Sequence, residues 1–185
     1  MKRIAIAALL LVLALPSGAA APPAIDACAL LDAAQIERVI RQAVEPGVRH
    51  DAGIESNGAW SSSCVWTLAA ERGAPVNPAA PLGGRGFVIL NAMRWPAGSG
   101  RSREFLESFR EAALAGVIEH APAPRPFGDE ALWWGDGLAV RKGDVSFGLS
   151  VHLPRTSSTV PGAWEEGLAP LVLNRIDRRS ANVRL

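Results

Sequence analysis

Residues 131–153, ALWWGDGLAVRKGDVSFGLSVHL, carry the strongest β-strand pattern in the chain. Apolar and polar side chains alternate along Val145–Leu153, which is the period of a strand with one apolar and one polar face. Two shorter strands, Ala131–Trp134 and Leu138–Lys142, precede it and are separated by glycine-containing turns. Because strands joined by such short turns run antiparallel, this stretch predicts three adjacent antiparallel strands. The polar side of the last strand is expected to face solvent or a cleft.

Helical and strand patterns also alternate in the rest of the chain. Apolar residues at helical spacing predict helices that begin at Asp32, at Ser102 and at Pro161. Asp32 and Gln35 have the spacing of a capping box, and Pro170 is expected to kink the last helix or split it in two. Two more strands are predicted over Cys64–Ala69 and Gly86–Trp95, and three connections over Val48–Ser63 (a loop), Glu71–Gly84 (mobile) and Ala121–Pro126 (extended and proline-rich).

The predicted elements follow one another in the order α-β-β-α-β-β-β-α. This order predicts an α+β fold, with an antiparallel sheet of about five strands and with helices packed on one face. The length of the chain suits a single domain of this kind, which we place at residues 21–177. A polar, arginine-rich C-terminal tail follows at residues 178–185.

Residues 1–20 have the pattern of a secretion signal. Two basic residues precede an unbroken apolar run over Ile4–Leu15, and small residues at Ala19 and Ala20 offer a cleavage site. The run is shorter than the roughly 20 residues that span a bilayer as a helix. An uncleaved anchor and a lipoprotein are the alternatives, but Cys28 lies well beyond the apolar run and follows no lipobox. We expect a periplasmic or secreted protein with neither a lipid anchor nor a transmembrane segment after signal cleavage.

Cys28 and Cys64 are the only cysteines in the chain. In an exported protein, a lone pair of cysteines predicts one structural disulfide. Cys64 is expected on the apolar face of its strand, pointing toward the start of the first helix. The alternative, a catalytic thiol at Cys64, requires that Cys28 is not its partner.

Three short motifs resemble a known group of proteins. They are Asp26-Ala27-Cys28-Ala29-Leu30-Leu31, then Cys64-Val65-Trp66, then Gly128-Asp129-Glu130-Ala131 leading to Val140-Arg141-Lys142-Gly143-Asp144. In this order they resemble uncharacterised bacterial exported and lipoprotein domains, which are similar in pattern to the extracellular sensor domains of some bacterial Ser/Thr kinases. The resemblance spans residues 25 to 177 and implies an exported α+β domain without established catalysis. The chain has neither the lipobox nor the kinase domain of those proteins, so no functional residue is carried over.

Charge and residue spacing argue against several function classes. The formal net charge of +1 is too small for an electrostatic nucleic-acid binder. The three histidines (His50, His120 and His152) lie far apart, and neither acidic doublet, Asp129-Glu130 or Glu165-Glu166, belongs to a metal-binding motif. The doublets are therefore interpreted as a turn and a solvated helix face, and no metal or other cofactor is predicted. The sequence also lacks the Gly-x-Ser-x-Gly and Ser-x-x-Lys nucleophile motifs.

Tryptophan is the unusual aromatic residue of this chain, which has six Trp and no Tyr. Trp133 and Trp134 are neighbours on a strand, so their side chains point to opposite faces and one of them leaves a one-sided core. An exposed indole can stack on a sugar, an aromatic group or a cation, and the alternative is that another segment covers it. We predict a ligand-binding sheet face that carries Trp133, Trp134, Ser150 and His152.

Two function classes remain after this search. The first is a non-enzymatic envelope module that binds an unidentified small ligand or an envelope protein. The second is a hydrolase-type enzyme whose site is assembled only in the fold. Because the sequence shows no catalytic constellation, we favour the binding module. A pocket lined by tryptophan and apolar groups would favour binding, whereas a perturbed histidine or acid beside a nucleophile would favour the enzyme.

Overall fold

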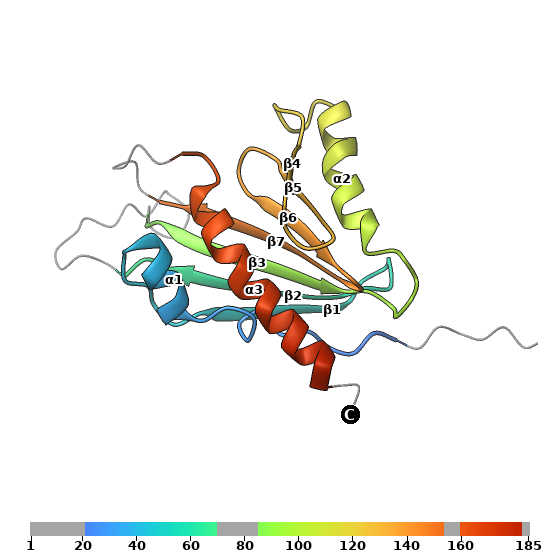
Figure 1. The fold of residues 1–185 in the computed structure, drawn as a ribbon, viewed down its shortest axis with the longest axis horizontal. Helices are drawn as coiled ribbons and strands as arrows, with labels where there is room; N and C mark the ends of the chain where they lie inside the picture. Colours follow the sequence, from blue (N-terminus) through green and yellow to red (C-terminus); the bar gives the residue numbers. More distant parts are fainter. Residues whose placement is uncertain (1–20, 70–84, 154–159, 183–185) are drawn as a thin grey trace, which may run out of the picture.

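The computed structural model describes residues 21–69, 85–153 and 160–182. The predicted signal peptide at residues 1–20 and the connection predicted over residues 71–84 therefore lie outside the described residues. Within the described chain, three helices and a single antiparallel sheet of seven strands form an α+β fold, which confirms the predicted class (Figure 1). The prediction of about five strands is wrong.

The sheet has the strand order β1-β2-β3-β7-β6-β5-β4, and every neighbouring pair is antiparallel. The central strand β7 pairs with β3 on one side and with β6 on the other. The strands are β1 (Val48–Ile54), β2 (Trp60–Thr67), β3 (Phe87–Arg94), β4 (Ala123–Arg125), β5 (Glu130–Trp133), β6 (Leu138–Lys142) and β7 (Val145–His152).

The two strands that the sequence pattern did not predict are the edge strands β1 and β4. All of β1 is exposed except Gly53, which is partly exposed, so it has no apolar alternation to signal a strand. Its place comes from pairing with β2, interrupted by a register shift between Asp51 and Gly53. The strand β4 contains Pro124, which an edge strand tolerates because the missing N–H faces away from the ladder. Both strands therefore depend on a neighbour rather than on their own composition.

Two helices cover one face of the sheet and the third helix covers the other. They are α1 (Ala33–Ile40), α2 (Arg103–Leu114) and α3 (Ala163–Asn182). Residues of α1 and α3 belong to the main hydrophobic cluster, whereas Leu106 of α2 packs against Leu132 and Ala139 from the opposite side (Figure 1). The prediction of helices on only one face is therefore wrong. An amphipathic pattern identifies the buried stripe of α2, but not the sheet face that the stripe meets.

The predicted capping box at the start of α1 is confirmed. The backbone N–H of Gln35 donates to Asp32 Oδ1 at 2.8 Å, and the backbone N–H of Asp32 donates to Gln35 Oε1 at 3.1 Å. These two bonds satisfy donors that a helix start otherwise leaves without partners.

Helix α3 continues through Pro170 and is not split. Proline removes one hydrogen bond from the ladder, but it lies on the exposed side of a helix whose other face is fully buried at Leu168, Ala169 and Val172. Burial of that stripe outweighs one lost bond. The helix also extends to Asn182, so the first part of the predicted C-terminal tail is helical.

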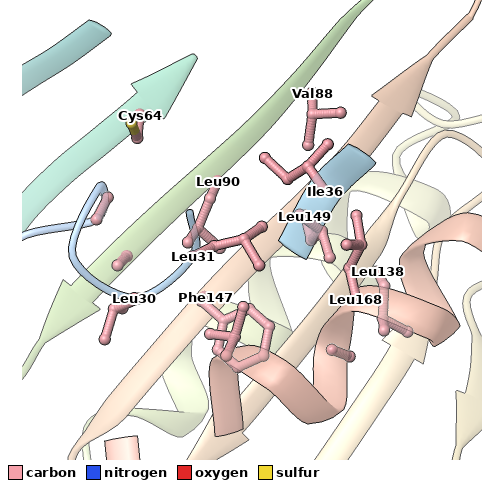
Figure 2. Packing of buried hydrophobic residues seen from close by; sticks show 14 of the residues in the cluster. Leu30, Leu31, Ile36, Cys64, Val88, Leu90, Leu138, Phe147, Leu149 and Leu168 are labelled. Atoms are coloured by element: carbon pink, nitrogen blue, oxygen red, sulfur yellow. The ribbon is translucent and has the colours of Figure 1, made fainter. Parts of the chain in front are cut away.

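The main core lies between the sheet and the pair α1 and α3. Figure 2 shows apolar side chains of β3, β6 and β7 pointing toward residues of α1 and α3 and of the N-terminal segment. Phe147, Leu149, Leu90 and Leu138 are all completely buried there. The apolar side of the strand predicted over Val145–Leu153 therefore faces the core, as expected.

A disulfide joins Cys28 in the N-terminal segment to Cys64 on β2, with their Cα atoms 5.1 Å apart. Polar contacts hold the same segment in place beside β1 and β2. The backbone N–H of Ala27 donates to the buried Ser62 Oγ at 3.2 Å, and Arg49 forms an ion pair with Asp26 at 2.7 Å. The predicted cysteine pairing is thus present, with Cys64 buried on the core face of its strand.

Candidate functional site

Trp133 and Trp134 point to opposite faces of the sheet, as their adjacent positions require. Trp133 lies on the α3 side, where its ring packs over Gly162 just before the helix. Trp134 lies on the α2 side and stacks on Phe109, with ring centroids 4.5 Å apart and an interplanar angle of 23°. Both indoles are half-buried. A helix therefore covers Trp134, because α2 occupies the face that the one-sided sheet would have left open.

Ser150 lies beside Trp134 on the α2 side of β7. Both side chains press against Gly137, where any side chain would overlap them. Ser150 is only 9% exposed. Ser146, four residues earlier on the same face, is completely buried and accepts a hydrogen bond from Trp95 Nε1 at 2.9 Å. The expectation that the polar side of this strand faces solvent or a cleft is therefore wrong over most of its length. Small polar residues are buried there because α2 and Trp95 cover them.

His152, at the end of β7, is exposed and its ring packs on Phe87 at a centroid distance of 4.5 Å. It shares a sheet face with Trp134 and Ser150 but not with Trp133, since side chains alternate along each strand. The four residues predicted to bind a ligand are thus divided between two faces. Two of the four, Trp133 and His152, line the same pocket.

The pocket lies at the start of α3, beside the turn between β5 and β6 and the end of β7. Its volume is about 190 Å³, and it opens to solvent. The described residues that line it are Trp133, Gly135, Asp136, Val151, His152, Val160, Pro161, Gly162, Trp164 and Glu165.

The chemistry of this pocket comes from two indoles and two carboxylates. Trp133 and Trp164 are half-buried and supply aromatic surface, while Asp136 is exposed and Glu165 is buried. Among the described lining residues there is no lysine or arginine. Aromatic faces and carboxylates both attract positive charge, so the walls are complementary to a cation with an apolar body.

Glu165 is held beside the end of β7, which extends beyond the first residue of β6. The last pair of these strands joins Leu138 to Leu149, so the N–H of Val151 has no partner on β6. The Glu165 carboxylate accepts that N–H at 2.8 Å and completes the ladder. The side chain is 3% exposed, and this loss of solvation raises its pKa, with a further contribution from the charge of Glu166. Bonds from backbone N–H groups oppose the rise.

We expect Glu165→Gln to stabilise the protein more at neutral pH than at acid pH. Because the folded-state pKa lies above the ordinary value of 4.5, the carboxyl proton contributes stability that is fully present below that value. This contribution is lost as the pH rises through the folded-state pKa. Glutamine keeps an oxygen for the N–H of Val151 and carries no charge, so it avoids the loss.

The measurement is the free energy of unfolding in urea for both proteins, from about pH 4 to about pH 8. Glu111→Gln, at an exposed position of α2, is the control and should show no such trend. The raised pKa of Glu165 would be contradicted if the difference in unfolding free energy between Glu165→Gln and the unchanged protein stayed constant with pH.

The sequence interpretation missed Glu165 because it placed the acidic doublet on a solvated helix face. The signal was present in the spacing. Glu165 precedes Leu168, Ala169 and Val172 by three, four and seven residues, which puts it on the buried stripe of α3. Trp164 packs against the main core and also lines the pocket, half-buried.

Within the described parts of the chain, no group of three or more His, Cys, Asp or Glu residues is arranged to hold a metal ion. None of the helices in these parts is long and apolar enough to cross a membrane. Comparison with models of protein families, with curated proteins and with solved structures finds no match for this chain.

Proposed function

We propose that the protein is an exported, non-enzymatic binding module that holds a small cationic ligand in the pocket at the start of α3. The observation that carries this proposal is the lining itself, in which Trp133 and Trp164 stand with Asp136 and Glu165. Indole faces attract ammonium and guanidinium groups through their quadrupole, and the attraction grows where water is excluded. Two carboxylates add a negative potential at the same place.

The size of the pocket limits the ligand. A volume of about 190 Å³ is below the roughly 300–1,000 Å³ of pockets that enclose drug-sized molecules. It accommodates an ammonium group with a few carbon atoms, or one such group at the end of a larger ligand. A larger ligand would extend across the open side of the pocket.

The side chains of the described lining residues favour binding over hydrolysis. None of them carries a hydroxyl, thiol or amine that could act as a nucleophile. The buried acid, Glu165, already accepts a backbone N–H that holds the end of β7. A raised carboxyl pKa therefore has a structural explanation here, without a catalytic role for Glu165.

Export is supported by the disulfide, by the sequence of residues 1–20 and by the resemblance to exported domains. The disulfide between Cys28 and Cys64 suits an oxidising compartment such as the bacterial periplasm or the extracellular space. The sequence of residues 1–20 has the charge and apolar pattern of a signal peptide, and the resemblance to exported domains points the same way.

The test is a titration of the tryptophan fluorescence with choline chloride, with sodium chloride at equal ionic strength as the reference. We expect a saturable change in the unmodified protein, and a five- to tenfold weaker affinity in Trp164→Leu and in Asp136→Asn, which corresponds to about 1 kcal/mol for each contact. Trp134→Phe, which alters the indole on the opposite face, is the matched control and should bind choline normally.

Choline is the first probe, and spermidine and arginine methyl ester extend the test to primary amines and guanidinium. If none of the three produces a saturable change up to about 10 mM, the cationic ligand class is wrong. If Trp134→Phe weakens binding as much as Trp164→Leu, the ligand lies on the α2 face instead.

A further inference from the structure

Three polar side chains gather at the end of the sheet where β2 begins and β3 ends. Trp60 and Arg94 are directly opposite each other in the register of β2 and β3 and point to the face that carries the main core. Helix α3 runs obliquely across this face (Figure 1). Arg179, in the C-terminal half of this helix, is near enough for its charge to act on Arg94. This place is distinct from the pocket, since about 22 Å of helix separates Trp164 from Arg179.

Two donors here are buried and have no acceptor among the described residues. They are Trp60 Nε1 and Arg94 Nε. Buried N–H groups almost always have a partner, and one left without a partner costs about 1–3 kcal/mol. A water or an ion that supplies an acceptor removes this cost, which makes the pair of donors an indication of a bound group.

Arg94 differs from the other half-buried arginines on the sheet. Arg141 also has a buried Nε without a hydrogen-bond acceptor, but its guanidinium forms ion pairs with Asp129 at 3.3 Å and with Glu130 at 3.7 Å. Arg125 forms an ion pair with Glu166 at 2.6 Å. Arg94 forms no hydrogen bond or ion pair with the described residues. Its half-buried charge therefore has no ion-pair partner among the described residues, and its buried Nε has no acceptor.

The surrounding charges increase the need for an anion. Burial lowers the pKa of Arg94, and the like charge of Arg179 lowers it further. Asp144 acts in the opposite direction, but its carboxylate oxygens already accept the N–H of Gly98 at 3.2 and 3.3 Å. The guanidinium groups of Arg94 and Arg179 and the indole N–H of Trp60 can only donate hydrogen bonds. Asp144 is the acid whose charge acts on Arg94, and it forms no ion pair with Arg94.

We propose that Trp60, Arg94 and Arg179 form a binding site for a small oxyanion, either phosphate or the carboxylate group of an organic ligand. An oxyanion between the two guanidinium groups cancels their repulsion and accepts charge-assisted hydrogen bonds from both. The same anion supplies an acceptor for Trp60 Nε1. The tryptophan contributes a single donor at a fixed position, which favours an anion small enough to contact all three side chains.

The first experiment measures the melting temperature in potassium phosphate against potassium chloride of equal ionic strength. We expect phosphate to raise the melting temperature by about 5–10 °C once its concentration exceeds the dissociation constant about a hundredfold. A parallel series in potassium acetate shows whether carboxylate binds in place of phosphate. If neither anion raises the melting temperature above the chloride reference, the proposal is wrong.

Three variants assign the response to the site. Arg94→Gln and Arg179→Gln should each weaken the preferred anion at least tenfold in calorimetric titration, and Trp60→Phe should weaken it a few-fold because only one N–H is lost. Arg103→Gln, at an exposed position of α2, is the matched control and should bind the anion normally. Equal losses in the control and in Arg94→Gln would show general charge screening instead of a site.

A second measurement does not depend on finding the right anion. In buffer with chloride as the only anion, Arg94→Met should leave the melting temperature unchanged or raise it, because it removes a half-buried charge and a buried N–H donor that has no acceptor. A fall of more than about 5 °C would show that the chain itself pairs Arg94, and this would overturn the proposal.

Discussion

Replacing Phe147 with alanine is expected to lower the free energy of unfolding by about 3–5 kcal/mol. Phe147 is completely buried on β7, the central strand of the sheet, between Ala92 on β3 and Val140 on β6. Its ring belongs to the cluster under α1 and α3 (Figure 2), so its removal leaves a cavity between two layers that β-strand pairing holds apart. The loss therefore combines the transfer free energy of the ring with the cost of that cavity.

Urea unfolding of Phe147→Ala, followed by circular dichroism, measures this change. Asn91→Ala is the matched control, because Asn91 lies on the neighbouring strand β3 with an exposed side chain on the other face. It should change stability by no more than about 0.5 kcal/mol. A loss below about 1 kcal/mol in Phe147→Ala would mean that β7 is not the centre of the core.

Breaking the disulfide is expected to lower the free energy of unfolding by about 3–4 kcal/mol. The bond joins residues 36 positions apart, and in the chain-entropy model a loop of this length restricts the unfolded chain by that amount. It also fastens the N-terminal segment beside β2, where Ile25, Leu30 and Leu31 bury their side chains. Its loss therefore frees a segment whose packing contributes to the core.

The comparison is between oxidised and dithiothreitol-reduced protein, each unfolded in urea. The double variant with both Cys28→Ala and Cys64→Ala is the control, and its unfolding should not respond to the reductant. Titration of thiols in the oxidised, denatured protein should find none. Two reactive thiols in that titration would rule out the bond in the isolated protein, whatever the stability difference.

Features that depend on residues close together in the sequence could be predicted from the sequence. The capping box of Asp32 and Gln35 needs only the backbone of one helical turn. The hairpin of β6 and β7 follows from a short turn and period-two alternation, and its bounds agree closely with the prediction. The pairing of Cys28 with Cys64 followed from their number and from the expected compartment.

The edge strands and the second helical layer could not be predicted in this way. Strand β1 is exposed along its length and exists because β2 offers it hydrogen bonds, so its own residues carry no signal. The pattern of α2 defines an apolar stripe, and only the connection after β3 decides which sheet face that stripe meets. The wrong face for α2 led directly to the wrong environment for Ser146 and Ser150.

The sequence by itself determined that Trp133 and Trp134 face opposite sides of a strand, because alternation is a property of the extended backbone. Only the tertiary structure decided that α2 covers Trp134 while Trp133 joins Trp164 and Glu165 at a pocket. The physical reason is that a pocket wall combines side chains from β5, β7 and α3, which lie far apart along the chain. Their meeting depends on how the helices pack on the sheet, and no local pattern records that packing.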